Sequence, residues 1–461
     1  MATKTKSFPP SNQVPNVTLK QDFASYMPGQ TMKEQLGRFE AARSTASGLA
    51  GADPSFLAQF QDKSATGFDP SRVLHGPLHG KPNTIEQKLS ILQEYATQAA
   101  LGNRHVFWTK CQADASKTDK SIPQSEINIC IPQIIPSDDE APFWQNVVIL
   151  SNSQDSERIA RSHIKKQPNL SASFFQSLIA TTDNEHWARQ RNYLNEVFLP
   201  FASLSKIFPT SLQRAKDCTG KLNTLSKNAG QYGVQMHEFF LHEAQAQLQM
   251  ALFGMDEEFM EKTNAPLRRM FSGTSLPGEE GFGTQACLDM LKKVEENPAF
   301  ATAAESLSSN KKVFGPLSKA VANAVHDLDM NLYDQFGNMM LILFAGHDTT
   351  AHTMTWLTYE LAHHPKYQKK VQIEVDALFE KLKLGKRAMI YEDCDQLPYL
   401  TRCVMETLRL WTAVPNGTFR QLQFDDEVVG PNGEMVELKK GTYVQGKKII
   451  LKKKTCTVIC L

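Results

Sequence analysis

The stretch NLYDQFGNMMLILFAGHDTTAHTMTWLTYELAH, residues 331–363, decides the fold of this chain. Residues 339–344 are apolar on every side, and apolar side chains then recur at Ala351, Met354 and Leu357, at the three-to-four spacing of a helix. The pattern predicts one long helix that is buried along most of its length.

Residues 345–350 of this helix, AGHDTT, do not suit a buried position. Gly346 costs about 1 kcal/mol relative to Ala in a helix interior, and a buried acid such as Asp348 needs a partner. Threonine hydroxyls can bond back to the carbonyl four residues earlier, and glycine leaves room for a ligand. Two interpretations remain open: a groove at a functional site, or a polar seam bonded to neighbouring helices.

Two further pairs could carry chemistry. Trp187 and Arg191 lie one helical turn apart, so their N–H groups could together hold one carboxylate. The alternative is an ordinary amphipathic helix with a half-buried Trp and a snorkelling Arg, which has the same spacing. Glu406 and Arg409, in PYLTRCVMETLRLW (398–411), could form a buried bidentate pair or an exposed pair worth about 0.3–0.5 kcal/mol.

These motifs, in their order along the chain, resemble those of the cytochrome P450 family, the haem-thiolate monooxygenases. The resemblance covers residues 84–445 and implies a mostly α-helical fold with a small β-rich side. It also implies haem iron as cofactor and electrons that come ultimately from NAD(P)H through a separate reductase. The implied reaction inserts one atom of O2 into an apolar small molecule.

The resemblance assigns roles to nine residues. Thr349 would hold the water that supplies a proton for oxygen activation, and Asp348 would relay protons inward. Ala345 and Gly346 would make room for oxygen. Trp187 and Arg191 would hold haem propionates, Arg420 would do so by position, and Glu406 and Arg409 would be structural.

The cysteine loop F-x-x-G-x-x-x-C-x-G, whose thiolate binds iron in this family, does not follow residue 445. Cys456 and Cys460 stand in a lysine-rich tail without the preceding Phe and Gly, so no metal ligand is assigned. We expect residues 446–461 to be an aberrant tail on a C-terminally incomplete copy. The alternative function is a catalytically silent protein of the same fold that binds an apolar ligand or a partner.

Composition narrows the class of protein. Lys and Arg number 50 against 49 Asp and Glu, which gives no reason to expect nucleic acid as a partner. Eight scattered cysteines favour reduced thiols, and no apolar stretch reaches the length of a transmembrane helix. The chain is expected to be soluble or peripheral; its compartment is not assigned, and the cytoplasm is one candidate. Lys4 and Lys6 before the first acid give only a faint organelle-targeting signal.

The chain divides into a loosely packed extension (1–85), a helical domain (86–445) and the tail (446–461). Further helices are expected over 32–44, 85–99, 155–165, 186–198, 201–226, 236–253, 285–296, 367–382 and 401–412, with a flexible loop at 272–283. Strands are expected over 105–108, 127–135, 147–150, 419–424, 428–429, 435–438 and 441–444.

Overall fold

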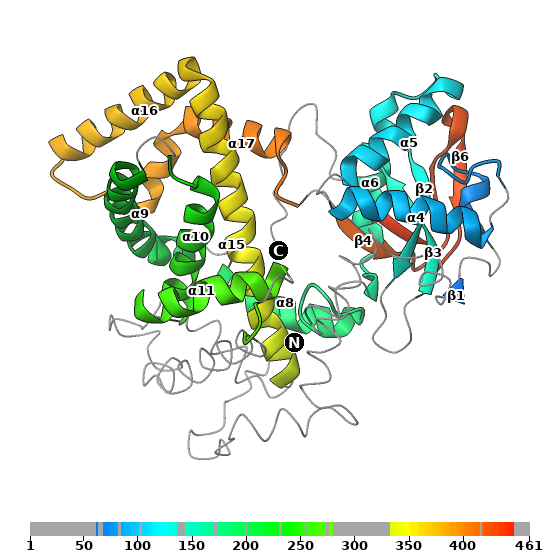
Figure 1. Ribbon diagram of the computed structural model, residues 1–461, viewed down its shortest axis with the longest axis horizontal. Helices are drawn as coiled ribbons and strands as arrows, with labels where there is room; N and C mark the ends of the chain where they lie inside the picture. The colour runs from blue at the N-terminus through cyan, green and yellow to red at the C-terminus, as the bar shows by residue number, and fades with distance from the viewer. Residues whose placement is uncertain are drawn as a thin grey trace, which may run out of the picture.

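The computed structural model shows a helical region beside a smaller β-sheet region (Figure 1). It describes residues 61–62, 68–81, 84–100, 104–135, 143–168, 174, 176–198, 201–229, 233–253, 257–272, 276–279, 332–414 and 417–446. The helices expected over 32–44 and 285–296, most of the 272–283 loop, and the tail beyond residue 446 lie outside these residues.

Helices make up most of the described chain, which confirms the predicted fold class. They are α4 (Ile85–Ala100), α5 (Arg104–Thr118), α6 (Ser153–Ser162), α8 (Asn184–Phe198), α9 (Phe201–Ala229), α10 (Met236–Phe253), α11 (Glu257–Ser272), α15 (Leu332–His363), α16 (Pro365–Leu384) and α17 (Pro398–Leu410). Among the described residues, no helix is long and apolar enough to cross a membrane.

The sheet joins segments from both ends of the chain. Its strands are β1 (Gln61–Asp62), β2 (Ile129–Ile135), β3 (Phe143–Leu150), β4 (Thr418–Gln421) and β7 (Tyr443–Gly446), in the order β1-β3-β7-β4 with β2 also paired to β3. β3 and β7 run parallel, whereas β2–β3 and β4–β7 are antiparallel. A separate hairpin pairs β5 (Asp426–Val429) with β6 (Met435–Leu438).

The strand expected over 105–108 is wrong, because these residues belong to α5. Phe107, Trp108, Cys111 and Ala115 are buried at helical spacing in the core between α5 and the sheet. An apolar run of four residues fits either a strand or one turn of a helix, and here the helix places all four buried groups on the sheet.

The loosely packed extension expected over 1–85 differs from the structure at residues 68–81. Leu74 is fully buried in the core with β3 and β7, and Leu78 is 1% exposed. Cys130 N–H donates to the carbonyl of His75 at 2.7 Å, so this loop is fastened to β2. The apolar residues that anchor it are too few and irregular to form a periodic pattern.

Among the described side chains of the long helix α15, the buried ones lie between residues 337 and 351. Met340, Leu341 and Leu343 are at most 1% exposed, whereas Met354 and Tyr359 are 41% and 48% exposed. Helix α10 packs along it, with Phe240 and Leu241 against the buried Ala351. The prediction of burial along most of the helix is therefore wrong beyond about residue 353, where α15 faces solvent between its neighbours.

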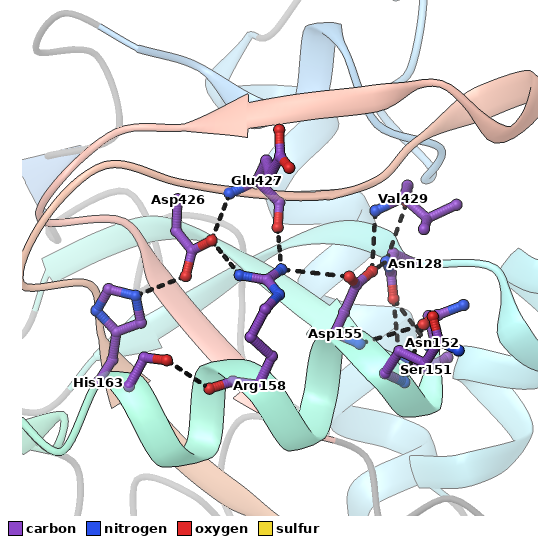
Figure 2. A network of polar contacts seen from close by, with 11 residues as sticks. Asn128, Ser151, Asn152, Asp155, Arg158, His163, Asp426, Glu427 and Val429 are labelled. Carbon is purple, nitrogen blue, oxygen red and sulfur yellow. Dashed lines mark hydrogen bonds and ion pairs between the residues drawn. The ribbon is translucent and has the colours of Figure 1, made fainter.

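A network of polar side chains ties α6 to the β5–β6 hairpin (Figure 2). Asp155 accepts hydrogen bonds from Asn128 Nδ2 at 2.7 Å and from the Val429 N–H at 2.9 Å. The fully buried His163 bonds Asp426 through Nε2 at 2.8 Å, and Arg158 pairs with both acids.

The hydrogen bonds also fix the form of the His163 ring. The Gln423 N–H donates to Nδ1 at 3.0 Å, so the ring proton lies on Nε2 and is directed at Asp426.

Acid is expected to weaken this network. Burial raises the pKa of Asp426, but hydrogen bonds from His163 and the Glu427 N–H, with the charge of Arg158, bring its pKa below the usual value. A lowered carboxyl pKa stabilises the fold above the unfolded value of about 4, and this stability is lost as pH falls through the folded pKa. Urea unfolding from pH 7 down to about 3 should show a steeper loss for the wild type than for Asp426→Asn.

Asp217→Asn, on the exposed side of α9, serves as control and should keep the wild-type slope. Parallel curves for wild type and Asp426→Asn would mean that the network does not depend on this charge.

Candidate functional site

Trp187 and Arg191 lie on one face of α8, as their spacing predicts. The Arg191 guanidinium stands over the indole ring, 5.3 Å from its centroid. Helix α8 begins after Asp183, whose carboxylate accepts the backbone N–H groups of Glu185 and His186. This cap fixes the first turn of the helix and so the direction of Trp187.

Two more cations come to the same place from other segments. Lys166, which follows α6, forms an antiparallel backbone bridge with Arg420 in β4. Its ammonium lies 5.4 Å from the centroid of the Trp187 ring and donates to the Leu178 carbonyl at 2.6 Å. Lys166 and Arg191 both lie over the Trp187 ring, and Arg420 lies beside Lys166. These three cations are called the cation cluster below.

Burial and neighbouring positive charges lower pKa values in this cluster. Burial, followed by the charges of Arg420 and Arg191, lowers the pKa of Lys166 to about 7. Burial also lowers the pKa of Arg420, whose Nε is buried and has no hydrogen-bond partner in the described residues. None of the three cations forms an ion pair within the part of the chain that the structure describes. Such a group suits an anionic ligand.

Sequence reasoning found Trp187, Arg191 and Arg420 but missed Lys166. No motif marks it, because its position depends on the bridge to β4 and on the side chain of Gln167. Gln167 Nε2 donates to the Arg420 and Val444 carbonyls at 3.0 and 2.9 Å. The only signal in the sequence was the pair Lys165-Lys166 at the end of the helix predicted over 155–165.

The AGHDTT segment continues α15 without a break. Thr349 Oγ1 donates to the Ala345 carbonyl at 2.8 Å, the back-bond expected for a threonine in a helix. The Asp348 Oδ1 atom lies 3.5 Å from His352 Nδ1. The His352 ring packs against the His237 ring of α10, with 4.8 Å between the ring centroids. The hydroxyls of Thr349 and Thr353 thus bond within their own helix, which differs from a seam bonded to its neighbours.

Gly346 faces α10 closely. A Cβ at this position would lie 2.8 Å from Leu248 Cδ2, so the missing side chain admits Leu248. The space that the sequence suggested for a ligand beside Gly346 is therefore occupied on this side by α10. Gly346 acts as a helix-packing residue.

A hydrogen-bond path joins the cation cluster to α15. Gln190, next to Arg191, accepts from Asn338 Nδ2 at 2.8 Å, and Asn338 Oδ1 accepts the Leu178 N–H at 2.9 Å. Asn338 lies three turns before Thr349, roughly 16 Å along the helix axis. The path holds α8, and with it the cluster, at a fixed place relative to the AGHDTT segment.

Glu406 and Arg409 form a bidentate pair with N–O distances of 2.7 and 2.5 Å. Their side chains are 55% and 38% exposed, so of the two interpretations the structure has the surface pair. Trp411, just beyond, stacks on Trp356 of α15 at 3.8 Å and donates to Glu360 at 2.8 Å.

The described residues contain no group of three or more His, Cys, Asp or Glu that could hold a metal ion. The geometry therefore brings together a cluster of cations and, on α15, an adjacent Asp348–His352 pair.

Comparison with known proteins gives matches to cytochromes P450. Residues 317–446 match the family model described as Cytochrome P450. Cytochrome P450 4A6 of Oryctolagus cuniculus is 43% identical over 103 residues, which is 22% of this chain and 18% of that protein. Cytochrome P450 27C1 of Danio rerio is 40% identical over 115 residues, 24% of this chain and 20% of that protein. The matches span about a fifth of the length of these curated relatives.

Proposed function

We propose, because residues 317–446 of this chain belong to the cytochrome P450 family, that the protein is a haem-dependent monooxygenase. Its substrate would be an apolar organic molecule, and a separate reductase would supply electrons from NAD(P)H. The observation that carries the proposal is the cation cluster, which assembles beside α15 from three segments distant in the sequence.

The cluster fits the two carboxylates of a haem. Arg420 keeps a buried Nε without a partner, Arg191 and Lys166 each lie over the Trp187 ring, and no acid pairs with these cations among the described residues. These four residues would bind and orient the propionates through charge-assisted hydrogen bonds. The bound haem would supply the iron that activates O2; we assign no iron ligand among the described residues.

Residues of α15 would transfer protons from solvent to the site. The Thr349 hydroxyl donates to the Ala345 carbonyl and keeps its acceptor lone pairs, so it could hold a water molecule beside the helix. Asp348 is half-buried and next to His352, and histidine is the side chain best suited to exchange protons with solvent near neutral pH. The pair would pass protons from solvent towards Thr349. Ala345 would leave room for O2 on the side away from α10.

A second candidate is a catalytically silent protein of the same fold that binds an apolar ligand or partner. The exposure of the Glu406–Arg409 pair favours it, because the family resemblance assigns a structural role to this pair.

Titration of the purified protein with hemin tests the proposal. Wild type is expected to bind stoichiometrically, with a Soret band that saturates. Arg191→Ala and Arg420→Ala should each weaken binding roughly 10-fold or more, because a hydrogen bond to a charged group contributes about 1.5–3 kcal/mol.

Arg189→Ala is the matched control, since Arg189 is exposed on the same helix, and it should bind like wild type. A wild type that does not saturate with hemin would overturn the monooxygenase proposal and leave the silent protein. Equal losses in Arg189→Ala and Arg191→Ala would remove the cluster from the site.

A further inference from the structure

Lys166 occupies a distinctive position within the cation cluster. Its ammonium is held between the Leu178 carbonyl, at 2.6 Å, and the Trp187 ring, at 5.4 Å to the centroid. Its backbone is fixed by the bridge to Arg420 and by the hydrogen bond from the Gln421 N–H to the Lys165 carbonyl at 2.9 Å. The side chain therefore cannot leave the cluster without breaking these contacts.

Within the described part of the chain, the charged groups that act on Lys166 are cations. Arg420 approaches from β4 and Arg191 from α8, while the segment that contains Leu178 offers a carbonyl oxygen. The guanidinium groups stay protonated at any physiological pH. Lys166 is thus the member of the cluster that can relieve the repulsion by losing its proton, and burial favours the same loss: its pKa is lowered to about 7.

We propose that a carboxylate ligand of the cation cluster binds together with a proton, which Lys166 takes up. The identity of the ligand as a haem propionate rests on the proposed function. The uptake of a proton on binding any carboxylate rests only on the geometry of the cluster. Lys166 is a positioning and charge-balancing residue in this proposal.

Proton linkage fixes the direction in which carboxylate affinity changes with pH. A carboxylate next to Lys166 stabilises the ammonium form, so the pKa of Lys166 is higher with the ligand than without it. Below about pH 6 Lys166 is charged in both states, and binding takes up no proton there. Above neutral pH the free protein holds neutral Lys166, so affinity should fall by up to about 10-fold per pH unit.

Competitive labelling with acetic anhydride, read by mass spectrometry, measures the titration of each lysine in the ligand-free protein. Lys166 should become reactive with a midpoint near neutral pH, and its neighbour Lys165 serves as the reference lysine. Succinate, a simple dicarboxylate, should move the Lys166 midpoint upward and leave Lys165 unchanged. A Lys166 midpoint far above neutral pH, or one that succinate does not move, would overturn the proposal.

Calorimetry with hemin, in two buffers of different ionisation enthalpy at about pH 7.5, counts the protons taken up on binding. Lys166→Arg keeps the charge permanently, so it should bind with similar affinity, take up about one proton fewer than wild type, and show a flatter pH dependence. Lys166→Met should lose affinity at pH 6 and also lose the uptake. Lys165→Arg should behave as wild type.

The outcomes separate the two proposals. Hemin binding with equal proton uptake in wild type and Lys166→Arg would overturn the linkage and leave the haem site intact. If the wild type does not bind hemin but succinate raises the titration midpoint of Lys166, the proposed function is overturned and a proton-linked carboxylate site is supported.

Discussion

Replacement of Arg214 by Met is expected to lower the free energy of unfolding by about 3–5 kcal/mol, because it leaves a buried carboxylate without its main partner. Arg214 in α9 is 3% exposed and bonds Glu243 of α10 through Nε at 2.5 Å. It also pairs with Glu257 at the start of α11. One side chain therefore joins three helices, and Lys221, at 3.3 Å and half-exposed, compensates Glu243 only in part.

Urea unfolding of a double-mutant cycle measures the effect. Arg214→Met combined with Glu243→Met should recover much of the lost stability, because the apolar pair leaves no uncompensated charge in the core. Arg189→Met, at an exposed position of α8, should change stability by less than about 0.5 kcal/mol. A loss below about 1 kcal/mol in Arg214→Met would contradict the role of Arg214 as the charge partner of Glu243.

Gly76→Ala is expected to cost roughly 3 kcal/mol or more, because the added methyl group has no space. The backbone at Gly76 has φ +157°, and a Cβ would lie 2.1 Å from the Cys130 carbonyl oxygen. The obstacle is backbone of β2, held by the hydrogen bond between Cys130 and His75, so it cannot turn aside as a flexible side chain can. Accommodation requires the loop to separate from the sheet.

Gly80→Ala gives the comparison in the same loop. Gly80 has φ +69°, and a Cβ added there would meet no described atom within 4 Å, so Ala meets only the backbone cost of about 1–2 kcal/mol. Thermal and urea unfolding of the two variants should separate the steric cost from the cost of the conformation. Equal losses would show that the contact with Cys130 is not tight in solution.

The sequence predicted the long, strongly patterned elements well, for physical reasons. Apolar spacing over many turns identified α15 and α10, and alternation or continuous burial identified β2 and β3, since such patterns have one consistent solution. The run at 105–108 was too short to distinguish strand from helix. The loop at 68–81 was missed because its Leu74 and Leu78 find their partners only in the assembled sheet.

The candidate site divides in the same way. The pair Trp187 and Arg191 is local, and helical spacing alone brings it together. Lys166 reaches the cluster because its backbone pairs with β4, and Gln167 donates to the carbonyl of a residue 253 positions later. A local sequence pattern cannot predict such a long-range contact. The packing of Gly346 against Leu248 likewise depends on how α10 crosses α15, and so the sequence suggested space where the structure has a contact.

The pairing of β3 with β7 has a consequence for how the chain is made. β7 lies parallel to β3, and Gln133 of the adjoining β2 bonds Gln445, 312 residues further along. At a synthesis rate of about 5–20 residues per second, the ribosome makes β7 roughly 15–60 seconds after β3. During that interval the apolar edge of β3, with Val147, Val148 and Ile149, is without its final neighbour on the nascent chain. The sheet should therefore form late, and chaperones that shield apolar strands should raise the yield of folded protein most when they act during translation.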